Sequence, residues 1–184
     1  LWPHLAEGPT WGVEFWQTKG GGSYNATAVR GPLTGQGAHV LLLDDLLKDQ
    51  SEADSEARRE AVWEWYTSTA YTRLAPGGGV LVMHTRWHTD DPIGRLLSEQ
   101  EGGGDTWEVI NYPAIAEEAE EHRAEGEALH PERYPLEDLE RIRSVLPARQ
   151  WAALYQQRPS PAEGGLFQRG WMRYHGGIDR PEHE

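Results

Sequence analysis

Two short apolar runs, each followed at once by polar residues, most constrain the fold of this chain. Residues 40–43 read Val-Leu-Leu-Leu and run into Asp44 and Asp45, and residues 80–83 read Val-Leu-Val-Met and run into His84. Continuous apolar runs of this length are typical of parallel strands that are buried on both faces. Each run therefore predicts a buried strand that carries polar groups at its carboxyl end.

Helical patterns follow both runs. Between them, apolar residues recur at intervals of three and four, which predicts a helix over about residues 51–73 with a Ser-x-x-Asp start. Pro76 and the three glycines after it are expected to close that helix. A second helix is predicted over residues 93–99, because Asp91 before Pro92 is a favoured helix start.

Two further strands are expected from β-branched and aromatic content. Residues 23–30 follow a glycine-rich turn at residues 19–22, and residues 107–112 follow three glycines. The order of strand, helix, strand, helix, strand predicts parallel βαβ units, so the expected fold class is α/β with a parallel sheet and flanking helices.

The character of the chain changes after Pro113. An acidic stretch at residues 117–127 reads as a solvated surface segment. Two short helical stretches follow, which predicts a small helical linker region. We therefore divide the chain into residues 1–112, 113–160 and 161–184.

Composition excludes several classes of protein. With no cysteine among 184 residues, a disulfide framework and a thiolate metal site are excluded. The net charge of −13 argues against a large non-specific DNA-binding surface. We expect a soluble intracellular protein, since no secretory signal or membrane-spanning apolar run is apparent. Because the first residue is Leu1, we also expect the chain to be a fragment of a longer reading frame.

The acids at the first strand end suit phosphate chemistry. An ATPase needs one carboxylate to hold Mg²⁺ and a second to orient or deprotonate the attacking water, at the edge where α/β sheets bind ligands. Asp44 and Asp45 have that position. The alternative is a surface turn with an aspartate helix cap.

The polar segment after the second strand has two interpretations. His84, His88 and the following Asp91 have the composition of a metal-hydrolase cluster. Both imidazoles share one face only in a helix, whereas the segment follows an extended run, so we predict that no zinc site forms. Thr85 is instead a candidate for sensing the γ-phosphate side of a nucleotide.

Several separated motifs give the sequence a specific resemblance. Over most of residues 31–173 it is similar to the large subunits of tailed-bacteriophage terminases, with motifs in the family's order. They are Leu33-Thr34-Gly35-x-Gly37-Ala38-His39, Leu41-Leu42-Leu43-Asp44-Asp45, Lys48-Asp49, Ala53-Asp54-Ser55, Trp65-Tyr66, Thr72-Arg73-Leu74, Thr85-Arg86-Trp87-His88, Gly126-Glu127-Ala128-Leu129-x-Pro131-Glu132-Arg133 and Ala153-Leu154-Tyr155-Gln156-Gln157-Arg158-Pro159.

The resemblance implies a motor that hydrolyses ATP to package double-stranded viral DNA, with a nuclease that cuts the DNA to length. It implies that Asp44 is the Walker B magnesium ligand and that Asp45 has the catalytic-carboxylate position, where many members carry Glu. Thr85 corresponds to the motif that couples hydrolysis to movement, and Arg86 is a candidate for contacting phosphate or a neighbouring subunit. The loop at Gly35 and Gly37 is expected to border the nucleotide.

The implied fold is a partial P-loop NTPase-type parallel sheet. Residues 1–112 are then the carboxyl-terminal part of the ATPase domain, and residues 161–184 lead into the nuclease. No Gly-x-x-x-x-Gly-Lys-Ser/Thr occurs in the sequence, and only Asp179 stands where nuclease acids are expected. We therefore expect the chain alone to be inactive.

The implied cofactors are ATP and Mg²⁺. The implied partners are double-stranded DNA, the portal protein, the terminase small subunit and further copies of the chain on the capsid, without a membrane. The expected location is the host cytoplasm, transiently at the procapsid, without secretion. One alternative is a non-catalytic remnant or interaction domain, and another is a metal hydrolase that uses His84, His88 and Asp91.

Overall fold

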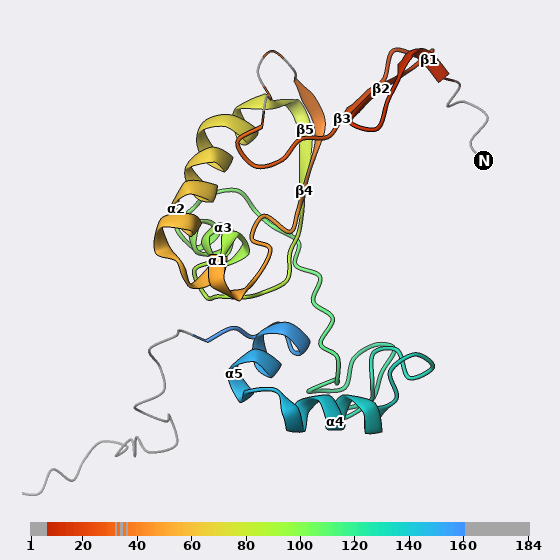
Figure 1. The fold of residues 1–184 in the computed structure, drawn as a ribbon, viewed down its shortest axis with the longest axis vertical. Helices are drawn as coiled ribbons and strands as arrows, with labels where there is room; N and C mark the ends of the chain where they lie inside the picture. Colours follow the sequence, from red (N-terminus) through yellow and green to blue (C-terminus); the bar gives the residue numbers. More distant parts are fainter. Residues whose placement is uncertain (1–6, 32, 34, 36, 161–184) are drawn as a thin grey trace, which may run out of the picture. The chain divides into compact units, whose positions relative to one another are not determined.

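The computed structural model describes residues 7–31, 33, 35 and 37–160, and within them the chain divides into two compact units. Within these ranges, unit 1 comprises residues 7–31, 33, 35, 37–48 and 55–84, and unit 2 comprises residues 49–54 and 85–160. The expected lead-in to the nuclease, residues 161–184, lies outside the described residues. The fold is mixed α/β with a parallel strand pair and flanking helices (Figure 1).

Unit 1 contains the predicted parallel pair. Strands β4 (Ala38–Asp44) and β5 (Leu74–Met83) are parallel, and Asp44 is the register partner of Met83. The two strands therefore end at the same edge. This confirms both apolar runs as strands and their parallel arrangement.

The prediction that these strands are buried on both faces was wrong within the described part of the chain. Leu43 is 3% exposed, whereas Val40, Leu42, Leu81 and Met83 are 53–71% exposed. Leu42 is opposite Leu81, so the exposed side chains of the two strands share a face. Helix α2 lies along one side of the pair (Figure 1). The sheet thus has one covered face and one open apolar face.

The predicted helix over residues 51–73 is four pieces. They are α1 (Gln50–Asp54), α2 (Glu56–Trp65), a π-helical stretch (Tyr66–Ala70) and a 3-10 turn (Tyr71–Arg73). Ser55 breaks the run because its side chain caps α2 by accepting a hydrogen bond from the backbone of Arg58. The helical stretch therefore begins within one residue of the predicted start at Ser51, but it is not one continuous helix.

Strand β5 is longer than predicted. Pro76 and the following glycines were expected to close the preceding helix, but they lie inside β5. Ala38 of β4 pairs with Leu74, whereas Val40 pairs with Gly79, so the register shifts across this segment. Gly77 has φ +77°, which glycine adopts without strain. The Pro-Gly segment is therefore accommodated as an irregularity of the strand.

The strand predicted at residues 23–30 is short and belongs to another sheet. Strands β1 (Glu7–Trp11), β2 (Phe15–Thr18) and β3 (Ser23–Asn25) form an antiparallel meander. The turn between β2 and β3 is where the glycines predicted it, since Gly22 donates its backbone N–H to the Thr18 hydroxyl.

In unit 2, helix α3 (Pro92–Glu101) has the predicted Asp91 cap and contains the predicted residues 93–99, but it continues to Glu101 before Gly102. The strand predicted at residues 107–112 was wrong, since those residues are not in a strand. Val109, Ile110 and Tyr112 are exposed there. The β-branched and aromatic content indicated a strand, but a strand also needs a hydrogen-bonding neighbour.

The end of the described chain forms a small helical cluster. It contains α4 (Leu136–Val145), α5 (Ala148–Gln150) and a π-helical stretch (Trp151–Tyr155). Leu139 and Trp151 are buried together, and the ring of Trp151 stacks on Tyr155 at 4.7 Å between centroids. Residues 117–127 are largely exposed, as the acidic composition predicted.

Candidate functional site

Asp44 and Asp45 lie where β4 leaves the sheet. Asp44 is the exposed last residue of the strand. The backbone N–H of Asp45 donates to the carbonyl of Met83 at 3.0 Å, so the chain stays attached to β5 for one residue beyond the strand. Asp45 has φ +41°, a left-handed conformation in which Asp and Asn are enriched. Asp44 therefore has the extended backbone of a strand, whereas Asp45 has a left-handed backbone conformation.

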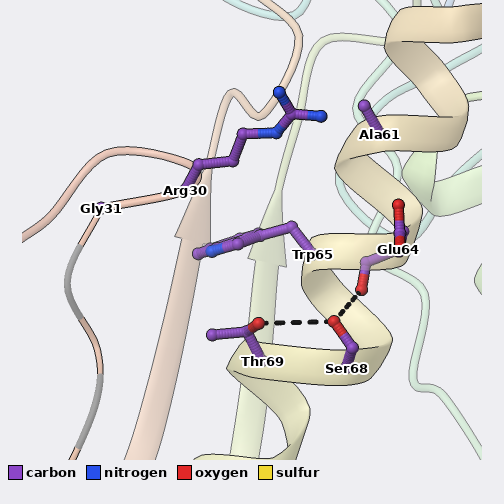
Figure 2. Close-up of a pocket in the computed structure, with 7 residues that line it drawn as sticks. All are labelled: Arg30, Gly31, Ala61, Glu64, Trp65, Ser68 and Thr69. Atoms are coloured by element: carbon purple, nitrogen blue, oxygen red, sulfur yellow. Dashed lines mark hydrogen bonds between the residues drawn. The ribbon is translucent and has the colours of Figure 1, made fainter.

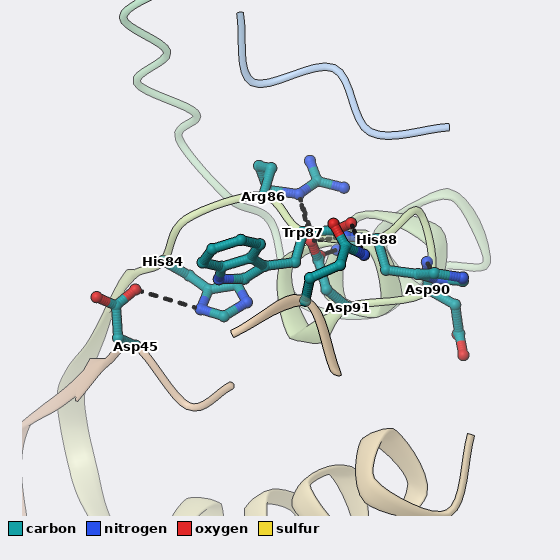
Figure 3. A network of polar contacts seen from close by, with 9 residues as sticks. Asp45, His84, Arg86, Trp87, His88, Asp90 and Asp91 are labelled. Carbon is teal, nitrogen blue, oxygen red and sulfur yellow. Dashed lines mark hydrogen bonds and ion pairs between the residues drawn. The ribbon is translucent and has the colours of Figure 1, made fainter. Parts of the chain in front are cut away.

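His84 follows β5 and lies beside Asp45. Its Nδ1 is 3.6 Å from Oδ1 of Asp45 (Figure 3). The imidazole is 0% exposed, whereas the Asp45 side chain is 57% exposed. Sequence analysis treated His84 only as a possible zinc ligand. Its contact with Asp45 was missed because the parallel register that brings the two together cannot be read from either segment alone.

The polar segment that opens unit 2 is organised around Asp91, which is fully buried. Its carboxylate accepts hydrogen bonds from Arg86 Nε at 3.1 and 2.8 Å (Figure 3). It also accepts a hydrogen bond from the backbone N–H of Gly94 at 2.9 Å. One carboxylate thus caps α3 and pairs with an arginine. Burial of the charge is compensated by these charge-assisted hydrogen bonds.

The side chain of Arg86 is held by hydrogen bonds that only one of its guanidinium nitrogens donates to side chains of described residues. Its Nε is engaged by Asp91, whereas its two terminal nitrogens make no side-chain hydrogen bond with any residue that the structure describes. The side chain is 18% exposed. Arg86 therefore has a fixed side-chain position and retains donors for an anion.

His88 and Asp90 are engaged within their own loop. His88 Nδ1 accepts a hydrogen bond from the backbone of Asp90 at 3.0 Å, and Asp90 forms a two-point ion pair with Arg95. Among residues 7–31, 33, 35 and 37–160, no group of three or more His, Asp or Glu side chains could hold a metal ion. With Asp91 committed to Arg86 and the helix cap, this geometry does not favour a hydrolase centre at His84, His88 and Asp91.

The loop that precedes β4 contains the two glycines expected near the nucleotide. Gly35 has φ +79°, and a Cβ atom there would meet no atom of a described residue within 4 Å. Gly37 lies against the backbone carbonyl of Arg73, which is 3.8 Å from where a Cβ would be. The positive φ explains why glycine is favoured at position 35.

A hollow of about 290 Å³ lies elsewhere in unit 1 (Figure 2). It is bordered by Arg30 and Gly31 and by one side of α2 and the π-helical stretch, including Trp65 and Ser68. Ser68 donates its hydroxyl to the carbonyl of Glu64 at 2.6 Å, which is a local helix contact. None of the site residues expected from the sequence borders this hollow.

Comparison with known protein families decides the assignment. The model of the family described as terminase large subunit, T4likevirus-type, N-terminal, matches residues 14–173, which is most of the chain. The chain belongs to this terminase family. No curated protein matches it. The expected resemblance to terminase large subunits is thereby confirmed at the level of the family.

The match includes the carboxyl-terminal cluster, where Gln156 has a role that sequence analysis missed. Its buried side chain accepts a hydrogen bond from the backbone N–H of Ile115 at 3.1 Å and donates to the carbonyl of Ile115 at 2.9 Å. It also donates to Glu117 at 3.0 Å. Gln156 thus substitutes for a strand neighbour, and only the fold shows which of the two adjacent glutamines does so.

None of the helices in the described part of the chain has the length and hydropathy that a membrane span requires.

Proposed function

We propose that this terminase chain is the Walker B-containing part of a motor that hydrolyses ATP to package double-stranded viral DNA, followed by a linker toward the nuclease. The main supporting observation is the parallel register that ends β4 and β5 at one edge, with Asp44 at the end of β4. Open α/β sheets bind ligands at that edge. Family membership supports the same assignment.

The donor set at the edge fits Mg²⁺. Asp44 offers an exposed carboxylate, and Mg²⁺ is typically bound by one or two carboxylates together with phosphate oxygens. We assign Asp44 as the magnesium ligand. Bound MgATP would supply the phosphoryl group and neutralise its charge. Gly35 and Gly37 are proposed to border the nucleotide, and no atom of a described residue lies within 4 Å of where a Cβ of Gly35 would be.

Asp45 is proposed to orient the attacking water and accept its proton. Its exposed carboxylate allows access from solvent, and its backbone is fixed by the hydrogen bond to Met83. Thr85 is proposed to couple hydrolysis to movement, as its place directly after His84 at the end of β5 suggests. Arg86 is proposed to contact phosphate or a neighbouring subunit through its terminal nitrogens.

The whole motor requires more than this chain provides. The sequence contains no phosphate-binding loop, so the group that cradles and neutralises the phosphates must come from another segment. We propose that residues 1–112 belong to the ATPase domain, 113–160 to the linker and 161–184 to the approach to the nuclease. The proposed partners are DNA, portal protein, small subunit and further copies, in the host cytoplasm at the procapsid.

The purified chain is expected to show no ATPase activity above background, because phosphoryl transfer depends on positioning and charge stabilisation. Turnover that disappears in Asp44→Ala would refute this expectation. The second candidate, a non-catalytic remnant, is favoured by the missing phosphate loop. The two are distinguished by the coding sequence upstream, where a phosphate-binding loop in frame supports the motor and its absence supports the remnant.

A further inference from the structure

The buried carboxylate of Asp91 does more than a helix cap requires. A cap needs one oxygen that accepts from the first turn of the helix, and a neutral Asn or Ser side chain serves as well as Asp. A carboxylate that is 0% exposed is costly unless its charge is paired, and Arg86 Nε provides that pairing at 2.8 Å. We propose that Asp91 is a positioning residue, which fixes the guanidinium of Arg86 with its terminal nitrogens open to an oxyanion.

The neighbouring pair of Arg95 and Asp90 shows the usual geometry in the same segment. Arg95 donates from Nε to one oxygen of Asp90 at 2.8 Å and from Nη2 to the other at 2.9 Å. Two parallel hydrogen bonds of this kind are common between arginine and a carboxylate. Arg86 instead donates from Nε alone to both oxygens of Asp91, at 3.1 and 2.8 Å. The pair with Asp91 therefore leaves the terminal nitrogens of Arg86 unused.

The backbone around Asp91 orients the carboxylate independently of Arg86. Oδ1 accepts a hydrogen bond from the backbone N–H of Gly94 at 2.9 Å, and Oδ2 lies 3.5 Å from the backbone nitrogen of His88. Arg86 Nη2 lies close to Gly94, 3.3 Å from where a Cβ of that residue would be. Arg86 is thus placed against the first turn of α3 by a carboxylate that is itself fixed.

The terminal nitrogens of Arg86 point away from Asp91 (Figure 3). Neither makes a hydrogen bond with a residue that the structure describes, and the side chain is 18% exposed. Their N–H groups form a planar fork that matches two oxygens of a phosphate. Because a guanidinium that is already held loses less side-chain entropy on binding, the contact with Asp91 favours phosphate binding. The inference rests on the proposed function, in which phosphate is one of the two contacts proposed for Arg86.

The test is NMR of the arginine side chains in the whole chain, with the heteronuclear Overhauser effect at Nε as the measure of mobility. In the wild type, the Nε–H of Arg86 should be as rigid as the backbone of α3. Asp91→Asn keeps an oxygen for the Gly94 cap but removes the charge, so Arg86 Nε should become mobile while the backbone shifts of α3 stay unchanged. Asp90→Asn is the matched control and should leave Arg86 rigid.

A mobile Arg86 Nε in the wild type, or one that stays rigid in Asp91→Asn, would overturn the proposal. A residue that only caps α3 would leave Arg86 unaffected by Asp91→Asn, so this readout separates positioning from capping. Where the asparagine variant does not fold, Asp91→Glu replaces it with the same expectation, because the charge is kept but the carboxylate moves by one methylene. If neither variant folds, the rigidity of Arg86 Nε in the wild type decides.

Titration with inorganic pyrophosphate separates this inference from the proposed function. Pyrophosphate should shift the side-chain signals of Arg86 in the wild type, and Asp91→Asn should weaken its binding about two- to tenfold, since one side chain must then be ordered on binding. If pyrophosphate leaves Arg86 unchanged while the mobility changes occur as expected, the phosphate contact of the proposed function fails and the positioning by Asp91 stands. If pyrophosphate binds the wild type and Asp91→Asn equally and Arg86 stays rigid in both, the positioning fails alone.

Discussion

The parallel strand pair in unit 1 and the helical cluster in unit 2 are stabilised in different ways. The strand pair buries Leu43 on one face and exposes Leu42 and Leu81 on the other. The helical cluster buries Trp151 and satisfies the backbone of Ile115 through Gln156. The strand pair thus keeps exposed apolar side chains. In the helical cluster, the polar side chain of Gln156 hydrogen-bonds the backbone of a segment distant in sequence. The difference shows that apolar residues can belong to a sheet with an exposed face or to a closed cluster.

Unit 2 should be most sensitive to loss of its buried polar groups. Asp91→Ala removes a buried ion-pair partner and the cap of α3, so it should lower the free energy of unfolding by about 3–5 kcal/mol. Asp90→Ala, at the more exposed pair with Arg95, should cost about 1 kcal/mol or less. Urea unfolding of both variants measures the difference. Equal costs would show that burial of the pair does not matter.

Substitutions on the two faces of the β4–β5 sheet should lower the free energy of unfolding by different amounts. Leu43→Ala should cost about 2–5 kcal/mol because it leaves a cavity on the covered face. Leu42→Ala, one residue earlier on the open face, should cost less than about 1 kcal/mol, since little apolar area returns to water. The same urea titrations compare them. A similar loss in both variants would mean that the open face is covered in solution.

The two adjacent glutamines provide a third comparison. Gln156→Ala should lower the free energy of unfolding by about 2–3 kcal/mol because it leaves backbone groups of Ile115 unsatisfied. Gln157→Ala removes one local hydrogen bond to Leu154 and should cost about 1 kcal/mol or less. Hydrogen exchange at the Ile115 amide should be accelerated only by Gln156→Ala. Acceleration in both variants would argue against a specific clamp.

The smallest effect is expected at Asp54. Burial acts to raise its pKa, but hydrogen bonds from Arg149 and Gln50 outweigh burial, so the pKa lies below the usual 3.8. A lowered pKa in the folded state stabilises the fold above the unfolded-state pKa and loses that contribution as the pH falls through the folded-state value. Because Asp54 is partly exposed, the contribution should be below about 1 kcal/mol.

Comparing wild type with Asp54→Asn by urea unfolding at pH about 7 and about 2 should show a small difference that disappears in acid. Asp138→Asn, at an exposed pair on α4, serves as the control and should show no comparable change. An Asp54 effect that is unchanged in acid would contradict the assignment of the shift to ionisation.

The sequence predicted what depends on local pattern. The apolar runs that became β4 and β5, the start of α3 at Asp91 and the exposed acidic stretch all have signals within a few residues. The errors occurred where a distant partner decides the outcome. Residues 107–112 have strand composition without a strand neighbour, and one face of the β4–β5 pair is not covered by described residues.

At the candidate site, too, the sequence predicted what depends on local pattern and missed what depends on a distant partner. The placement of Asp44 and Asp45 at a strand end followed from the sequence, because four apolar residues precede them. The contact of His84 with Asp45 depends on the register between two strands about 40 residues apart, and strand register over such a separation cannot be read from local spacing. The buried pair of Arg86 and Asp91 was missed for another reason. Asp91 was read as a helix cap and as a possible metal ligand, and neither interpretation required an arginine.

The central claim is that the edge formed by β4 and β5 is the ATPase edge of a packaging motor. It is tested most directly by Mg²⁺-dependent ATP hydrolysis in a polypeptide that joins this chain to a phosphate-binding loop, with Asp44→Asn beside Glu118→Gln on the exposed acidic stretch. We predict that Asp44→Asn lowers kcat by about 100-fold or more, because the metal loses its protein ligand, and that Glu118→Gln retains full activity. Hydrolysis that survives Asp44→Asn undiminished would contradict the assignment.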